Sequence, residues 1–337
     1  MKLLDTVLLF SLPASGKSEV RTYMASLTEE QCRRDFGMGP TLQLDDYPYV
    51  HLMHCIDDEL RAHGWHDVYY QGPTRPFRDS WTWAVLIELL NEDYAHLLAQ
   101  NPYPTQNPAE LLFDRLDAAH QKFGLPEVMG DVPHRIRKKV AACLQAEASR
   151  ELELLNHTVS QDRTGKTIVI EAARGGPNGA AFPLCPPHGY ATAFEVLSPT
   201  ILERASVLYI WVDPAESRRK NIARGQPNAQ GSILHHCVPM EVMLGQYGTD
   251  DMACLIEQSD RPGTIRIERI LEHREHSEHG GPVSRYEARS YYLPVARLDN
   301  RVDKTTFVRV PRSEWREADI KALHDGLATA FADIMKR

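Results

Sequence analysis

The segment VLLFSLPASGKSEV, residues 7–20, constrains the fold of this chain more than any other. The short apolar run 3–10 is typical of a buried strand, and the glycine-containing turn after it leads into a helical pattern over 17–27. A strand that passes through a tight turn into a helix begins a βα unit, and repeated βα units build parallel sheets covered by helices. The segment therefore predicts an α/β fold.

The turn itself, residues 11–18, has the composition of a phosphate-binding loop. Such a loop aims backbone N–H groups and the positive end of a helix dipole at one point, while a lysine reaches the terminal phosphates and a hydroxyl holds Mg²⁺. We expect Gly16 to allow close backbone approach, Lys17 to supply the charge and Ser18 to supply the metal-binding hydroxyl. The remaining loop residues expected to surround the phosphates are Ser11, Pro13, Ala14 and Ser15.

Ser11 stands where this pattern usually carries its first glycine. A serine can hold that position if its backbone keeps a negative φ, because glycine is needed only where φ is positive. The alternative interpretation is a chance S-G-K-S sequence on an ordinary strand-to-helix turn.

The rest of the chain alternates between strand and helix patterns. Strands are predicted over 41–46, 167–171, 205–214, 263–271 and 290–300, and helices over 50–64, 79–101, 108–122, 134–156, 215–225 and 313–337. This alternation predicts a mostly parallel sheet covered on both faces. The helices between about 50 and 160 are too many for one crossover, so we expect a core of residues 1–48 and 160–337 and an inserted helical lobe of residues 49–159.

Acidic residues follow two of the predicted strands. Asp45 and Asp46 end the second strand and Glu171 ends the third, at the sheet edge where ligands of parallel sheets bind. A carboxylate there can accept the proton of an attacking hydroxyl or hold Mg²⁺ through water, and we expect Asp45 to act on the acceptor and Glu171 on the metal side. Asp46 is expected to contact substrate, although it also suits a helix N-cap, and Arg174, in the turn after Glu171, is expected to contact substrate as well.

Basic side chains gather after the fourth strand. Arg218, Arg219 and Arg224 lie within about two helical turns, and arginine forks match phosphate oxygens. With residues 225–250 they predict a lid, about 218–250, that closes over the phosphates, although such runs also form plain solvated faces. Arg75 and Arg78 lie in an aromatic-rich stretch that either clamps an anionic acceptor or packs the lobe.

Together these segments resemble the phosphate-loop kinases of the nucleoside and nucleotide kinase type, most of all the uridine kinase and phosphoribulokinase branch. The resemblance rests on S-L-P-A-S-G-K-S, on L-D-D-Y at 44–47, on the strand ending in Glu171 and on the arginine-rich helix. It implies a three-layer P-loop NTPase fold, ATP and Mg²⁺ as cofactors, and Asp45 as the base toward an acceptor hydroxyl. By the same resemblance Lys17, Arg218, Arg219 and Arg224 act on the phosphates, and Asn300 lies beside adenine.

The predicted function is therefore an ATP-dependent small-molecule kinase whose lobe binds the acceptor, a nucleoside, nucleotide or sugar derivative. The alternative is a nucleotide-dependent regulatory ATPase whose lobe binds a protein partner. The acceptor, the choice of ATP over GTP and the oligomeric state stay open, and a homodimer is one option.

Composition bears on partners and compartment. The net charge of −8 argues against a nucleic-acid partner, and no apolar stretch is long enough to span a membrane. Six scattered cysteines suit a reducing cytoplasm. His51, His54 and Cys55 have metal-ligand spacing on a predicted helix, but without an evident fourth ligand they are interpreted as ordinary core or surface residues.

Overall fold

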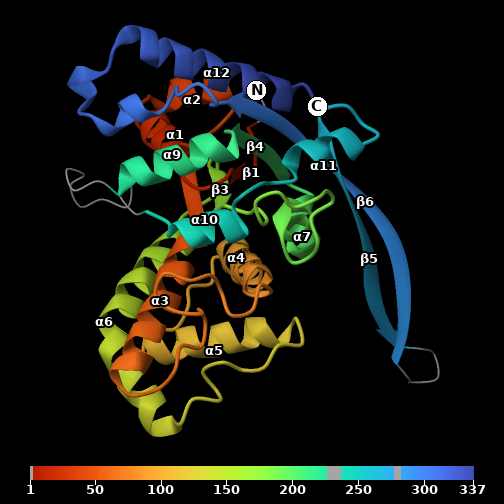
Figure 1. Ribbon diagram of the computed structural model, residues 1–337. Helices are drawn as coiled ribbons and strands as arrows, with labels where there is room; N and C mark the ends of the chain where they lie inside the picture. Colours follow the sequence, from red (N-terminus) through yellow and green to blue (C-terminus); the bar gives the residue numbers. More distant parts are fainter. Residues whose placement is uncertain (1–2, 226–236, 277–281) are drawn as a thin grey trace.

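The computed structural model describes residues 3–225, 237–276 and 282–337 (Figure 1). Its centre is a six-stranded sheet with the order β2-β3-β1-β4-β6-β5. The strands are β1 (Thr6–Phe10), β2 (Thr41–Asp45), β3 (Thr167–Ala172), β4 (Ala205–Trp211), β5 (Thr264–His276) and β6 (Pro282–Asp299). All neighbouring strands pair in parallel except β5, which runs antiparallel to β6. The predicted α/β class and mostly parallel sheet are confirmed.

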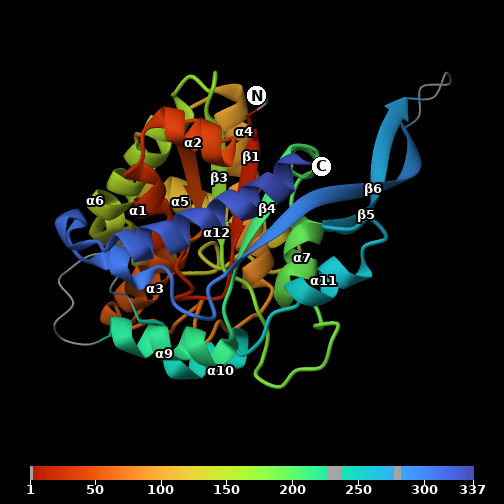
Figure 2. The ribbon, with the colours of Figure 1, turned by 90° about the horizontal axis from the view of Figure 1, so that it is seen from above.

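Both faces of the sheet carry helices, as the continuous apolar runs of β1 and β3 require. One face packs against α1 (Lys17–Ala25), α2 (Glu29–Phe36) and α12 (Glu317–Met335). The other packs against α4 (Thr82–Ala99), α7 (Gly189–Val196) and α8 (Pro199–Leu202). Figure 2 shows α12 lying across the strands, with α7 beyond them.

The helices between β2 and β3 build a second core. Besides α4 they are α3 (Tyr47–Ala62), α5 (Pro108–Gln121) and α6 (His134–Val159), and they lie below the sheet in Figure 1. Helix α4 serves both cores, because Leu86 packs within the lobe while Leu90 and Tyr94 pack under the sheet. The division of the chain near residues 48 and 159 stays a prediction, and α4 crosses that division.

Three features differ from the sequence prediction. Strand β6 begins at Pro282 rather than 290, and it pairs with β5 in a ribbon that extends away from the body (Figures 1 and 2). Helix α2 is not among the helices predicted from the sequence, although Thr28 and Gln31 form a capping box, which is a sequence signature of a helix N-terminus. Within the described part of the predicted lid lie α9 (Pro214–Arg224) and α10 (Met240–Gln246), and α11 (Met252–Gln258) follows. Residues 226–236 of the predicted lid lie outside the described residues.

The strand order places the carboxyl end of β1 at a point where ligands bind in sheets of this kind. The chain leaves β1 toward the α1 face and leaves the neighbouring β3 toward the α7 face. A crevice forms where adjacent parallel strands send their connections to opposite faces. Residues 11–16 and Glu171 meet at that point.

Candidate functional site

The loop that joins β1 to α1 has the backbone geometry its sequence requires. Ala14 and Gly16 have positive φ values of 57° and 107°, whereas Ser11 is not among the residues with positive φ. The condition under which serine replaces glycine at position 11 is therefore met. Lys17 begins α1, whose first N–H groups have no partner within the helix and so favour an anion.

Gly16 is required for steric reasons as well as for its φ. A Cβ atom there would lie 2.6 Å from Thr305 Oγ1 and 3.1 Å from Asn300 Nδ2. We expect Gly16→Ala to lower the free energy of unfolding by about 1–3 kcal/mol, because strained φ and a buried clash both act. The matched control is Gly245→Ala in α10, where a Cβ meets nothing within 4 Å, and we expect it to be neutral or mildly stabilising. Chemical denaturation of both variants measures the difference, and equal stabilities would contradict the assigned strain.

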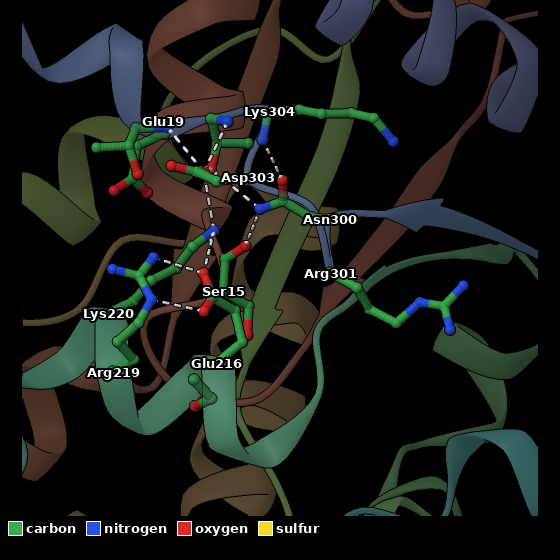
Figure 3. Close-up of polar contacts among 12 residues, drawn as sticks. Ser15, Glu19, Glu216, Arg219, Lys220, Asn300, Arg301, Asp303 and Lys304 are labelled. Atoms are coloured by element: carbon green, nitrogen blue, oxygen red, sulfur yellow. Dashed lines mark hydrogen bonds and ion pairs between the residues drawn. The ribbon is translucent and has the colours of Figure 1, made fainter.

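The segment after β6 supports the loop from behind. The Asn300 side-chain amide donates to the Ser15 carbonyl at 2.8 Å and to Thr305 Oγ1 at 3.0 Å, and its carbonyl accepts from Lys304 N at 2.7 Å (Figure 3). Asn300 is fully buried, so these bonds fix the loop conformation. The structure thus places Asn300 as a support of the loop between β1 and α1, and its position beside adenine stays a prediction.

Lys17 faces carboxylates across the crevice. Its Nζ lies 3.1 Å from Ser11 Oγ and 3.4 Å from the Ser11 carbonyl oxygen. Burial lowers the pKa of the Lys17 ammonium, although the negative charges of Glu171 and Asp45 oppose that shift. A partly desolvated ammonium at this point has strong affinity for a polyanion that displaces the bond to Ser11.

Asp45 and Glu171 lie side by side because β2 and β3 pair in register at their ends. Burial raises the pKa of Asp45 to about 7, and the charges of Glu171 and Asp46 add to the shift. Burial also raises the pKa of Glu171, while Arg21 of α1 opposes it from 2.7 Å. A carboxyl group that titrates near neutral pH suits proton transfer.

Asp46 and Arg174 bind each other. Arg174 Nη1 donates to Asp46 Oδ2 at 2.5 Å, its Nη2 donates to the Trp83 carbonyl at 3.2 Å, and its guanidinium lies 5.0 Å above the Trp83 ring. Both side chains are buried, so the pair joins the end of β3 to helix α4 of the lobe. A substrate role for either residue stays a prediction. In that role Arg174 would contact substrate through its Nε, which has no hydrogen-bond partner among the described residues.

The three arginines of α9 have different surroundings. Arg224 lies 3.2 Å from the buried Glu19 of α1, which also pairs with Arg309 at 2.6 Å. Arg219 is 63% exposed and pairs with Glu216 one turn before it, so the structure does not bring it to the loop (Figure 3). Arg218 follows Ser217, whose hydroxyl donates to the Pro13 carbonyl at 2.6 Å and so holds α9 against the loop.

Helix α9 is anchored rather than free. Besides the Ser217 bond, Lys220 pairs with Asp303 at 2.9 Å, and both Ser217 and Lys220 are buried (Figure 3). The loop residues beneath it, Leu12 and Ser15, are also buried. The structure therefore shows α9 held against the loop at the Pro13 carbonyl.

The other predicted substrate contacts lie apart from the loop. Arg75 is exposed and pairs with Glu241 of α10, which links the lobe to the segment predicted as a lid. Arg78 is exposed as well. Ser18 lies half-buried in the first turn of α1, next to Lys17.

Among the described residues, four buried guanidinium nitrogens have no hydrogen-bond partner. They are Arg21 Nε, Arg174 Nε, Arg218 Nη1 and Arg224 Nε. Buried polar atoms in native proteins nearly always have partners, so these nitrogens are free to donate to a bound anion. Arg21 pairs with Glu171, Arg174 with Asp46 and Arg224 with Glu19, and Arg218 follows the Ser217 that contacts the loop.

A cavity of about 310 Å³ lies between the end of β2 and the lobe helices α3, α5 and α6. Asp45, Tyr49 and Arg115 contribute polar groups to its lining, and leucine side chains supply much of the rest. Its size is at the lower end of the range for small-molecule sites.

Sequence reasoning missed several residues of this region: Glu19, Arg21, Ser217, Asp303, Thr305 and Arg309. Glu19 and Arg21 were within reach of the sequence, because they follow Lys17 by two and four positions on the same helix. The others come from segments about 200 to 290 residues farther along the chain.

Within the residues that the structure describes, none of the helices combines the length and hydrophobicity needed to cross a bilayer. Comparisons of the chain with protein-family models, with curated proteins and with solved structures give no match.

Proposed function

We propose that this chain is an ATP-dependent phosphotransferase of the P-loop kinase type that acts on a small-molecule acceptor. The observation that carries the proposal is that Arg21, Arg174, Arg218 and Arg224 each keep a buried guanidinium nitrogen without a hydrogen-bond partner among the described residues, on elements that adjoin the Lys17 loop and the Asp45–Glu171 pair. These nitrogens suit the charge of a triphosphate, because arginine forks match phosphate oxygens and act strongly where water is excluded.

Each residue takes a role that follows from its place. Lys17 and the N-terminal N–H groups of α1 bind the terminal phosphates, and the Ser18 hydroxyl would hold Mg²⁺, which neutralises phosphate charge when bound. Glu171 would bind the Mg²⁺ ion through a water molecule. Arg224 is the lid arginine best placed for charge neutralisation, since it is buried beside α1, and Arg218 offers an open nitrogen.

Asp45 acts toward the acceptor. Its carboxylate takes the proton of an acceptor hydroxyl as that oxygen forms a bond to the γ-phosphorus, and the bond from phosphorus to the β,γ-bridging oxygen breaks with its electron pair leaving on ADP. A carboxyl pKa near 7 lets the group accept this proton and release it at neutral pH. The cavity between Asp45 and the lobe supports an acceptor site there.

Opening of helix α9 is part of the proposal. Ser217 holds α9 against the Pro13 carbonyl of the loop and Lys220 holds it to Asp303, and we expect these two contacts to shift when nucleotide binds. Closure over bound phosphates then excludes water from the transfer step.

A screen of ATP consumption over nucleosides, nucleotides, sugars and cofactor precursors tests the proposal. We expect ADP formation that depends on one acceptor class and that yields a phosphorylated product by mass spectrometry. Slow ATP hydrolysis that no acceptor stimulates would favour the regulatory ATPase instead. Absence of nucleotide binding by calorimetry would exclude both.

A further inference from the structure

Helices α3 and α6 carry a cluster of metal-ligand side chains in the lobe, away from the phosphate loop. His51 and Cys55 lie one turn apart on the same face of α3, and Glu147 of α6 reaches them. One ligand atom of each, His51 Nε2, Cys55 Sγ and a Glu147 carboxylate oxygen, lies within 4.8 Å of the other two.

The separations suit coordination of a common ion. His51 Nε2 lies 3.6 Å from Cys55 Sγ, which is about the N···S separation when both bind one tetrahedral zinc at ~2.0 and ~2.3 Å. His51 Nε2 lies 2.7 Å from Glu147 Oε1, a hydrogen bond that a metal between the two atoms would replace. Glu147 Oε1 also lies 3.3 Å from Arg150 Nη2, so the carboxylate has a second partner, which is exposed to solvent.

The same residue types recur about two turns farther along the same helix pair. Glu59 and His63 of α3 meet Cys143 of α6, with 3.9 Å between the glutamate and the imidazole and 3.8 Å between the imidazole and the sulfur. Cys143 is exposed, whereas every member of the first cluster is half-buried. The first cluster is therefore the better preformed of the two.

The chemistry of the set selects the ion. An imidazole, a thiol and a carboxylate together favour zinc or cobalt over magnesium and calcium, which prefer oxygen ligands alone. Three protein ligands leave a fourth position for water, as in zinc sites that are open to solvent. Burial raises the pKa of the Cys55 thiol to about 12, so metal binding would release its proton to solvent.

We propose that His51, Cys55 and Glu147 form a Zn²⁺ site that links α3 to α6 within the lobe. The site revises the interpretation of His51 and Cys55 as ordinary residues, because the third ligand comes from a helix more than 90 positions away in the chain. It is independent of the proposed phosphotransferase activity.

Titration of the metal-free full-length protein with Co²⁺ tests the site, since a cobalt–thiolate bond has a charge-transfer absorption that unligated Co²⁺ lacks. We expect this absorption in the unmodified protein, its loss on addition of Zn²⁺, and a rise in Tm with Zn²⁺. We expect Cys55→Ser to weaken Co²⁺ binding by at least about tenfold, and Glu147→Gln to do so with the thiolate band retained at high Co²⁺.

Cys254→Ser removes a half-buried cysteine of α11 and is the matched control, and Cys143→Ser reports on the second cluster. Both variants should keep the high-affinity band. Tm values of the metal-free variants check that each one folds. If Cys55→Ser does not fold, the loss of Co²⁺ affinity in Glu147→Gln tests the site instead. A band that survives Cys55→Ser at unchanged affinity, one that disappears in Cys143→Ser instead, or no band in the unmodified protein would overturn the proposal.

Discussion

Lys17→Ala is expected to lower phosphoryl-transfer turnover by about 10²–10³-fold and to weaken nucleotide binding, because it removes a desolvated positive charge from the phosphate site. The lysine is partly buried and faces Asp45 and Glu171, so without it only Arg21 would offset these two carboxylates beside the phosphates. Steady-state kinetics with the identified acceptor and calorimetry with ATP measure the two effects.

The matched control is Lys321→Ala, on the exposed face of α12, where the lysine pairs only with the exposed Asp325 among the described residues. Both variants should fold, since burial already disfavours the Lys17 ammonium and its removal relieves that cost. If Lys17→Ala binds ATP and turns over like the control, residues 11–18 are an ordinary turn and the proposed function fails.

Asp45→Asn is expected to bind nucleotide normally but to transfer the phosphoryl group about 10²–10⁴-fold more slowly. With its pKa raised to about 7, Asp45 gains its basic form as pH rises, so the turnover of the unmodified protein should climb through pH 7 and then level. The asparagine variant lacks that limb of the pH profile. A variant that keeps the limb, or that transfers at the unmodified rate, would show that Asp45 is not the base.

The raised pKa of Asp45 also lowers the stability of the folded protein at high pH. The folded-state pKa of Asp45, about 7, exceeds its unfolded value of about 4, so between these pH values the folded protein binds more protons and loses stability as pH rises. Asparagine does not titrate, and we expect Asp45→Asn to have the higher Tm at pH 8, with the difference shrinking toward pH 4. Asp325→Asn, an exposed site on α12, controls for the change of net charge. A lower Tm for Asp45→Asn at pH 8 would contradict the raised pKa.

Elements with strong local signals were predictable from the sequence. The strand before residue 11, the turn at Gly16 and the helix from Lys17 follow from contacts within a few residues, and so does the placement of Asp45 at the end of β2. Helices α4, α5 and α6 were predictable for the same reason, because periodicity over many turns outweighs single-residue exceptions.

The surroundings of the loop were not predictable in this way. The run of arginines on α9 indicated a helix with several charges on one face, yet periodicity does not say which face turns inward. Packing of Ser217 against Pro13 decides this, and it buries Arg224 while leaving Arg219 in solvent. In the same way, the sequence predicted substrate contacts for Arg174 and Asp46 separately, and only the fold shows that the two side chains lie 2.5 Å apart.

Local sequence therefore specified the backbone geometry of the loop between β1 and α1, because backbone conformation depends on neighbours a few positions away. The fold alone decided which distant groups support and cover that loop, as Asn300 does from 285 positions beyond Ser15. Hydrogen bonds and ion pairs between segments so far apart form only when the sheet aligns its strands, and no pattern within one segment encodes that alignment.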